Sequence, residues 1–185
     1  MGLPQRKKYT YEEFLEITKD EKYAEFINGE IFLHATPTLI HQHVVGRLYA
    51  KFLEYFDKTQ NGCMPFIAPF DIIFENENET NKVQPDIFVL CGEKPMNKNS
   101  FKGVPALVVE VLSPSNSSYD YVKKMDLYSR FGVEEYWIVS PSNKTVEIFS
   151  LTSEGVYGEP VIYFANNIKS SIFEGLSIEL DSLFK

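Results

Sequence analysis

The chain has 185 residues, of which 44% are hydrophobic and 15% aromatic, and its formal net charge is −8. This length and apolar content exclude a disordered chain and predict one domain, residues 1–185, with a core that needs no metal or disulfide. The acidic balance argues against broad charge-driven binding to nucleic acid, which normally shows as a basic face. It does not exclude an enzyme that acts on nucleic acid, because a bound metal adds positive charge locally.

Hydropathy and cysteine spacing bear on location. No stretch approaches the roughly 18 consecutive apolar residues that span a bilayer, and the first residues contain no apolar signal core. Cys63 and Cys91 lie far apart and show no spacing typical of metal ligands. We therefore expect two separate thiols, buried in or near strands, in a cytoplasmic protein.

The first third of the chain predicts a helix, a hairpin and a longer helix. A Thr-x-x-Glu capping box predicts a helix over 10–17. Two apolar runs separated by Asn-Gly predict a β-hairpin over 23–34, with Glu25 in the middle of its first strand. Apolar residues at three- and four-residue spacing predict an amphipathic helix over 41–56.

The rest of the chain predicts strands around one further helix, over 117–131, which ends at Gly132. Strands are expected over 63–67, 69–74, 85–90, 106–112, 134–140, 145–150, 156–164 and 176–180, and surface loops over 75–81 and 92–103. The runs at 85–90 and 106–112 are apolar on both alternations, which is typical of strands buried on both faces. The pattern predicts an α/β fold with a central mixed sheet flanked by helices.

These two buried runs each carry an acidic residue. Asp86 follows a proline at a strand start, where a solvated strand end is the simplest interpretation. Glu110 lies between pairs of apolar residues, and a buried carboxylate without a partner costs several kcal/mol, so it should have a cation or hydrogen-bond donors beside it. A salt bridge to a lysine or arginine would supply such a cation. A divalent metal shared by two carboxylates on neighbouring strands is the more economical partner.

A lysine on the following helix is the third candidate. Lys124 lies four residues after Asp120, so the two share a helix face, and taken alone this spacing is typical of an exposed ion pair worth about 0.3–0.5 kcal/mol. Because the helix directly follows the Glu110 strand and must pack back on the sheet, Lys124 can instead reach over the carboxylates and stabilise negative charge on a phosphate. Tyr128 lies one turn further on the same face.

Several motifs in a fixed order carry a resemblance to a known family. They are Tyr23-Ala24-Glu25-Phe26-Ile27-Asn28-Gly29-Glu30, Pro37 with His41, Pro85-Asp86, Leu107 to Ser115, Asp120-x3-Lys124-x3-Tyr128, and Gly132-Val133-Glu134-Glu135-Tyr136-Trp137-Ile138-Val139. In this order they resemble the Uma-type restriction endonuclease family of the PD-(D/E)XK nuclease superfamily. Each motif is weak alone, but the ordered set is specific.

The resemblance implies a restriction-endonuclease-like fold, a four-stranded mixed sheet core flanked by helices, here with an extra N-terminal hairpin and C-terminal strands. It also implies Mg²⁺-dependent phosphodiester hydrolysis, with Mn²⁺ as a substitute and with Asp86 and Glu110 as metal ligands. The superfamily pattern places a lysine two residues after the glutamate, where this sequence has Leu112, so Lys124 is the matching candidate. Glu25 matches the family's early glutamate, which in many relatives adds a third carboxylate; a cross-strand partner for a lysine is the equal alternative.

The histidines are expected to be structural. His41 should cap or pack at the start of the second helix, because imidazole is a poor ligand for Mg²⁺. His34 and His43 carry no signal of their own.

The leading hypothesis is a Mg²⁺-dependent DNA endonuclease in which Asp86 and Glu110 bind the metal and Lys124 and Glu25 complete the catalytic set. The alternative is a catalytically inactive nuclease-fold domain that acts as a binding or assembly module, which the acidic charge and Leu112 favour. A metal-dependent hydrolase with another substrate is a third hypothesis. An apolar, Tyr-rich surface and the need to cut two strands would suit a homodimer.

Overall fold

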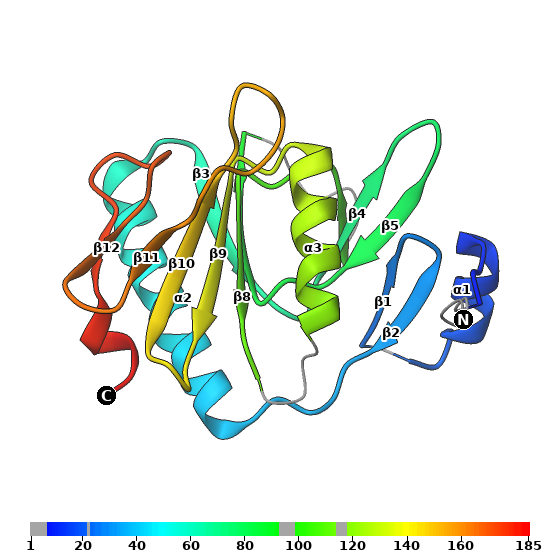
Figure 1. Ribbon diagram of the computed structural model, residues 1–185, viewed down its shortest axis with the longest axis horizontal. Coiled ribbons are helices and arrows are strands. Elements are labelled where there is room, and N and C mark those ends of the chain that lie inside the picture. Colours follow the sequence, from blue (N-terminus) through cyan, green and yellow to red (C-terminus); the bar gives the residue numbers. More distant parts are fainter. Residues whose placement is uncertain (1–6, 22, 93–98, 114–117) are drawn as a thin grey trace, which may run out of the picture.

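A six-stranded sheet runs through the middle of the molecule. Its strands are β3 (Cys63–Ile67), β6 (Ile87–Cys91), β8 (Leu107–Val111), β9 (Glu135–Ser140), β10 (Thr145–Ser150) and β11 (Val161–Tyr163). In the computed structural model, which describes residues 7–21, 23–92, 99–113 and 118–185, they lie in the order β11-β10-β9-β8-β6-β3 (Figure 1). The sheet is mixed, because β8 and β9 pair in parallel whereas the other neighbours are antiparallel.

The parallel pair requires a crossover, and helix α3 (Ser118–Phe131) supplies it. The helix ends at Gly132, whose φ of 89° lies in the left-handed region that favours glycine. Within α3 the structure describes side chains from Val122 onward. Leu127 and Tyr128 pack against the face of the sheet that α3 covers.

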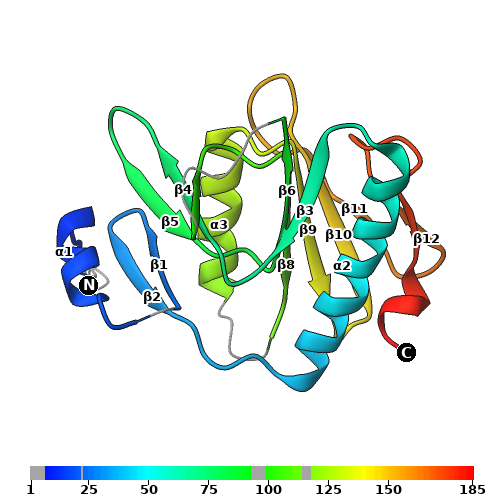
Figure 2. The ribbon, with the colours of Figure 1, turned by 180° about the vertical axis from the view of Figure 1, so that it is seen from behind.

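Helix α2 (Leu39–Thr59) covers the opposite face, as Figures 1 and 2 show from the two sides. Thr38 caps its first turn by accepting a hydrogen bond from the backbone N–H of His41. Its apolar stripe, buried against the sheet, consists of Val44, Val45, Leu48, Phe52 and Phe56.

Strand β8 lies between these two helices and contributes side chains to the apolar clusters on both faces of the sheet. Leu107, Val109 and Val111 belong to the apolar cluster under α2, whereas Val108 belongs to the cluster under α3. Since side chains alternate along a strand, Glu110 points to the α3 side. All five residues of the strand are buried.

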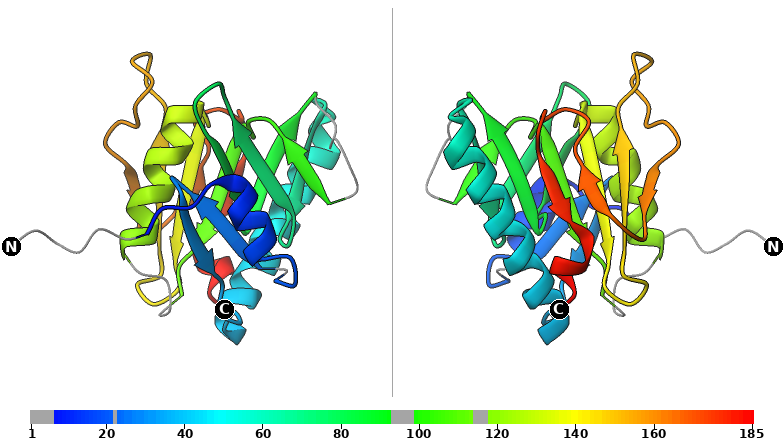
Figure 3. Two further views of the ribbon diagram at one scale, coloured as in Figure 1. Left: turned by 90° about the vertical axis from the view of Figure 1, so that its right-hand side faces the viewer. Right: turned by 90° about the vertical axis from the view of Figure 1, so that its left-hand side faces the viewer.

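A second, five-stranded sheet packs beside α3. Its strands are β1 (Ala24–Ile27), β2 (Glu30–Leu33), β4 (Asp71–Glu75), β5 (Thr80–Val83) and β7 (Ser100–Lys102), in the order β2-β1-β5-β4-β7. The β1–β2 turn uses Asn28 and Gly29 at φ 50° and 78°, the positive angles that the Asn-Gly pair predicts. Helix α1 (Tyr11–Ile17), with its capping box, lies against β1 and β2 (Figure 3).

The C-terminal segment forms a small hairpin, β12 (Asn167–Lys169) with β13 (Ser177–Glu179), followed by the 3₁₀ turn η1 (Leu180–Leu183). Ile168 and Ile178 join the apolar cluster under α2, and the right-hand view of Figure 3 shows the segment beside that helix. Within the described residues, no helix combines the length and apolar character of a membrane span.

Two sequence-based expectations about loops were wrong, and one strand was missed. The polar stretch 75–81 is a hairpin, in which Thr80 and Asn81 begin β5 and Asn81 is fully buried. The expected loop 92–103 contains β7, and the tail contains β12 as well as the two expected strands. These strands are short and polar, so they gain their stability from pairing with neighbours that sequence periodicity does not identify.

The expectation of two separate thiols was also wrong. Cys63 and Cys91 are directly opposite each other on β3 and β6, with Cα atoms 4.0 Å apart, and they form a disulfide. Cys91 is exposed at the end of its strand. The register of β3 and β6 brings together two cysteines that are 28 residues apart in the sequence, and their spacing alone does not reveal it.

Candidate active site

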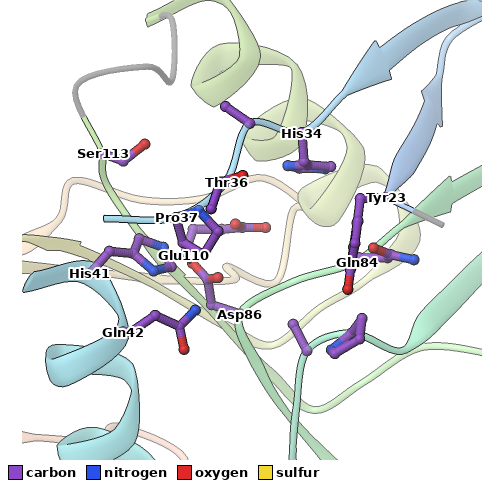
Figure 4. Close-up of a pocket in the computed structure, with 13 residues that line it drawn as sticks. Tyr23, His34, Thr36, Pro37, His41, Gln42, Gln84, Asp86, Glu110 and Ser113 are labelled. Carbon is purple, nitrogen blue, oxygen red and sulfur yellow. Dashed lines mark hydrogen bonds and ion pairs between the residues drawn. The ribbon is translucent and has the colours of Figure 1, made fainter. Parts of the chain in front are cut away.

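The register of β6 and β8 brings Asp86 and Glu110 together. Ile87 pairs with Val109 across the two antiparallel strands, so Asp86, one residue before β6, comes opposite Glu110. Both line a cavity of about 530 Å³. Figure 4 shows their carboxyl groups next to each other, with His41 and His34 on opposite sides.

One oxygen of Asp86 takes two hydrogen bonds. The backbone N–H of Val111 donates to Oδ2 over 2.8 Å, and His41 Nε2 lies 3.1 Å from the same oxygen. Burial disfavours the imidazolium, but the hydrogen bond and the charge of Asp86 outweigh burial and raise the pKa of His41 above its usual value. The other oxygen, Oδ1, has no hydrogen-bond partner in the described part of the chain.

Glu110 also has one oxygen that takes two hydrogen bonds, here from donors on α3. Its Oε1 accepts hydrogen bonds from Lys124 Nζ over 2.9 Å and from the Tyr128 hydroxyl over 2.8 Å. Among the described residues, Oε2 has no such partner. Burial raises the pKa of Glu110 to about 7, and the charges of Asp86 and Glu25 add to this effect while that of Lys124 opposes it.

Lys124 lies between two carboxylates. Its Nζ is 2.9 Å from Oε1 of Glu110 and 2.9 Å from Oε1 of Glu25, and the residue is only 7% exposed. Burial alone would lower the pKa of the lysine, but the two acids outweigh it and raise that pKa above its usual value. The ammonium is therefore a fixed positive charge at neutral pH.

Glu25, in the middle of β1, uses both oxygens within the protein. Oε1 accepts from Lys124 and, over 2.8 Å, from the backbone N–H of Gln84, while Oε2 lies 3.1 Å from His34 Nε2. Burial opposes its charge, yet Lys124, His34 and Gln84 together lower the pKa of Glu25 to about 2. The glutamate thus stays ionised as the partner of the lysine.

The donor set is suited to a hard divalent cation. Asp86 and Glu110 each have one oxygen anchored twice and one oxygen without a protein partner in the described ranges. The described residues contain no group of three or more His, Cys, Asp or Glu side chains that could hold a metal, so Asp86 and Glu110 offer a pair of carboxylates and no third ligand of this kind. Mg²⁺ commonly uses one or two carboxylates and completes its shell with water, so two open oxygens fit it.

All four residues singled out from the sequence come together here: Asp86, Glu110, Lys124 and Glu25. The side chain of Asp120 lies outside the described residues. Leu112 points to the same side of β8 as Glu110 and packs in the α3 cluster, and Lys124 brings an ammonium group to that side from the helix.

The sequence did not reveal how the site is held in place. His41 was expected to cap or pack but contacts Asp86, and His34, without a signal of its own, contacts Glu25. Gln84 enters through its backbone, which no side-chain pattern marks. The spacing of Tyr128 from Lys124 was the one usable signal, since both lie on the helix face toward Glu110.

A mixed sheet with a helix on each face and acids on adjacent strands defines an α/β protein of the restriction-endonuclease-like fold. The family model Uma2, described as "Putative restriction endonuclease", matches residues 11–181, and the chain belongs to this family.

Two further proteins are similar to this chain. The crystal structure of a protein from Anabaena variabilis, described as a "putative nuclease", superposes with a TM-score of 0.78 over 95% of this chain and 97% of that chain, at 20% identity, and thereby shows the fold. An uncharacterized protein of Synechocystis is 29% identical over 151 residues, which cover 80% of this chain and 77% of the relative.

Proposed function

We propose that this protein is a Mg²⁺-dependent DNA endonuclease that hydrolyses phosphodiester bonds. The observation that carries the proposal is the matched pair of open oxygens, one on Asp86 and one on Glu110, on adjacent strands and lining the same cavity. Membership of the Uma2 family supports nuclease chemistry. The proposed metal ligands are Asp86 and Glu110, and Mn²⁺ is expected to substitute for Mg²⁺.

The metal would supply Lewis-acid stabilisation of a phosphate oxygen and a more acidic bound water. Asp86 and Glu110 bind and orient it through their open oxygens. Lys124, a permanent cation, offsets negative charge that develops on the scissile phosphate or orients the attacking water. Tyr128 steadies Glu110 through its hydroxyl.

Glu25 is proposed to act through Lys124. Since Gln84, His34 and Lys124 occupy both of its oxygens, it is better placed to hold the ammonium than to bind the cation directly. Of the two roles that the sequence left open, a partner for a lysine therefore has the better support. A carboxylate of such low pKa keeps Lys124 charged over the whole physiological range.

Nicking of supercoiled plasmid DNA tests the proposal. Wild-type protein with Mg²⁺ or Mn²⁺ should convert the plasmid to open-circle or linear forms, and Asp86→Asn, Glu110→Gln and Lys124→Met should each abolish this. Asp126→Asn, on an exposed ion pair of α3 with Arg130, is the matched control and should retain activity. Nicking that persists in all three site variants would refute the assignment.

A second candidate is a catalytically inactive module that binds or assembles with a partner. One observation favours it: among the described residues, those that line the cavity include no lysine or arginine to attract a phosphate, and Lys124 is buried against Glu110. Calorimetric titration with Mn²⁺ separates the two functions. Heat that disappears in Asp86→Asn supports the enzyme, and its absence in the wild type supports the module.

Three further expectations stay predictions. Residues 1–185 are expected to form one domain, the protein is expected in the cytoplasm, and a homodimer would place two sites on one duplex. Light scattering of the purified protein measures the last directly.

A further inference from the structure

We propose that His41 is a positioning residue that fixes the carboxylate of Asp86 so that Oδ1 faces the cation. The inference rests on the proposed metal site and adds a residue beyond the proposed ligands and catalytic set. The distance between His41 Nε2 and Asp86 Oδ2 is 3.1 Å. Because an ionised carboxylate only accepts hydrogen bonds, the imidazole donates in this contact.

The imidazole sits on a rigid support. His41 occupies the first turn of α2, where the Thr38 cap fixes its backbone, and the residue is only 7% exposed. The helix that carries it runs to Thr59 and buries its apolar stripe against the six-stranded sheet. A side chain with so little room can aim one nitrogen reproducibly, as a loop residue at the cavity mouth could not.

The two donors on Asp86 act on the same oxygen. The N–H of Val111 also donates to Oδ2, so this oxygen is held from both the β8 backbone and α2. With one donor removed, the carboxylate can turn away from this orientation about its last torsion at little cost, and neither oxygen is then held toward the cation. Two donors on one oxygen therefore reserve the other for the metal.

Glu110 shows the same design with different residues. Lys124 and Tyr128 both donate to Oε1 and leave Oε2 without a partner in the described segments. The same pattern occurs at both carboxylates, with donors from opposite layers of the molecule. This argues that the free oxygens are held in place for a ligand. Residues that orient metal ligands in this way typically change metal affinity about 10–100-fold when mutated.

Calorimetric titration of the DNA-free protein with Mn²⁺ tests the inference, using His41→Ala, His41→Gln and His41→Asn. Glutamine can place an amide donor close to the position of Nε2, whereas asparagine is too short. We expect the Mn²⁺ dissociation constant to rise about 10–100-fold in the Ala and Asn variants and to recover most of the way in the Gln variant. His43→Ala is the matched control, because His43 lies two residues away, is exposed and contacts Lys185 and Arg47 rather than Asp86.

The outcomes separate this inference from the proposed function. Wild-type binding that vanishes in Asp86→Asn, with unchanged affinity in His41→Ala, would overturn the role of His41 and leave the metal site standing. Equal losses in the Gln and Asn variants would overturn it as well, since the donor position would then not matter. Wild-type protein without Asp86-dependent binding would overturn both. If His41→Ala fails to fold by circular dichroism, the Gln and Asn pair decides.

Discussion

Asp86 and Glu110 lie side by side, but opposite layers of the molecule hold them. Asp86 is anchored from the α2 side by His41 and by a backbone amide, and its side chain keeps 19% of its exposure. Glu110 is anchored from the α3 side by a buried lysine and a buried tyrosine. Asp86 is held by hydrogen-bond donors near solvent, whereas Glu110 is held by a buried ammonium group. Substitutions at the two ends of the site should therefore destabilise the protein by different amounts.

The largest expected effect is at the lysine that holds the Glu110 end. Lys124→Met leaves Glu25 and Glu110 buried without their cation and should lower the free energy of unfolding by about 3–5 kcal/mol. Asp86→Asn, at the other end, keeps an acceptor for Val111 and should cost about 1 kcal/mol. Urea denaturation measures both, with Lys58→Met in an exposed ion pair as the control. Equal costs at the two ends would contradict the comparison.

Acid should weaken the Glu25–Lys124 contact in a defined window. The pKa of Glu25 in the folded protein, about 2, lies below its ordinary value of 4.5, so its stabilisation is complete above about pH 4.5 and is lost as pH falls toward 2. The stability difference between wild type and Glu25→Gln should therefore shrink by about 3 kcal/mol between pH 5 and pH 2. Denaturation curves at several pH values measure it, and a difference that stays constant would show that folding does not lower the pKa of Glu25.

Metal should stabilise the site through both ends at once. Mn²⁺ at about 100 times its dissociation constant should add about 2.7 kcal/mol to the free energy of unfolding, and a chelator should remove this together with the nicking activity. Either Asp86→Asn or Glu110→Gln should abolish the added stability. Thermal unfolding with and without Mn²⁺ tests this, and a gain that survives in both variants would place the ion elsewhere.

Of the two donors that hold the Glu110 end, the tyrosine should have the smaller effect. Tyr128→Phe removes one donor from Oε1 of Glu110 but leaves Lys124 in place, so it should cost about 1.5–3 kcal/mol, toward the lower end of that range because a second donor remains. Urea denaturation gives the value. A loss as large as that of Lys124→Met would show that the hydroxyl, and not the ammonium, is the main partner of the glutamate.

The sequence revealed residues whose type conflicts with their surroundings. Glu110 interrupts an apolar strand, and Lys124 lies on the helix that must return over it, so both were found without any knowledge of three-dimensional contacts. The second helix followed from the period of its apolar residues, the first from its capping box, and the buried central strands from their continuous apolar runs.

Contacts between distant segments could not be predicted in this way. His41 and Asp86 are 45 residues apart, and Gln84 contributes a backbone N–H to Glu25 from 59 residues away. The same holds for β5 and β7, whose polar sequences resemble loops until their partners are known, and for the disulfide, which depends on strand register.

The alternation along β8 has a consequence for folding fidelity. A slip of one residue in the pairing of this strand would turn Val108 and Glu110 toward α2 and place the carboxylate among Val44, Leu48 and their neighbours, where it has no donor. Burying a charge in that way costs several kcal/mol, so the misregistered sheet is strongly disfavoured. The residue proposed to bind an ion therefore also fixes the register of the sheet, since only one alignment of the central strand can accommodate it.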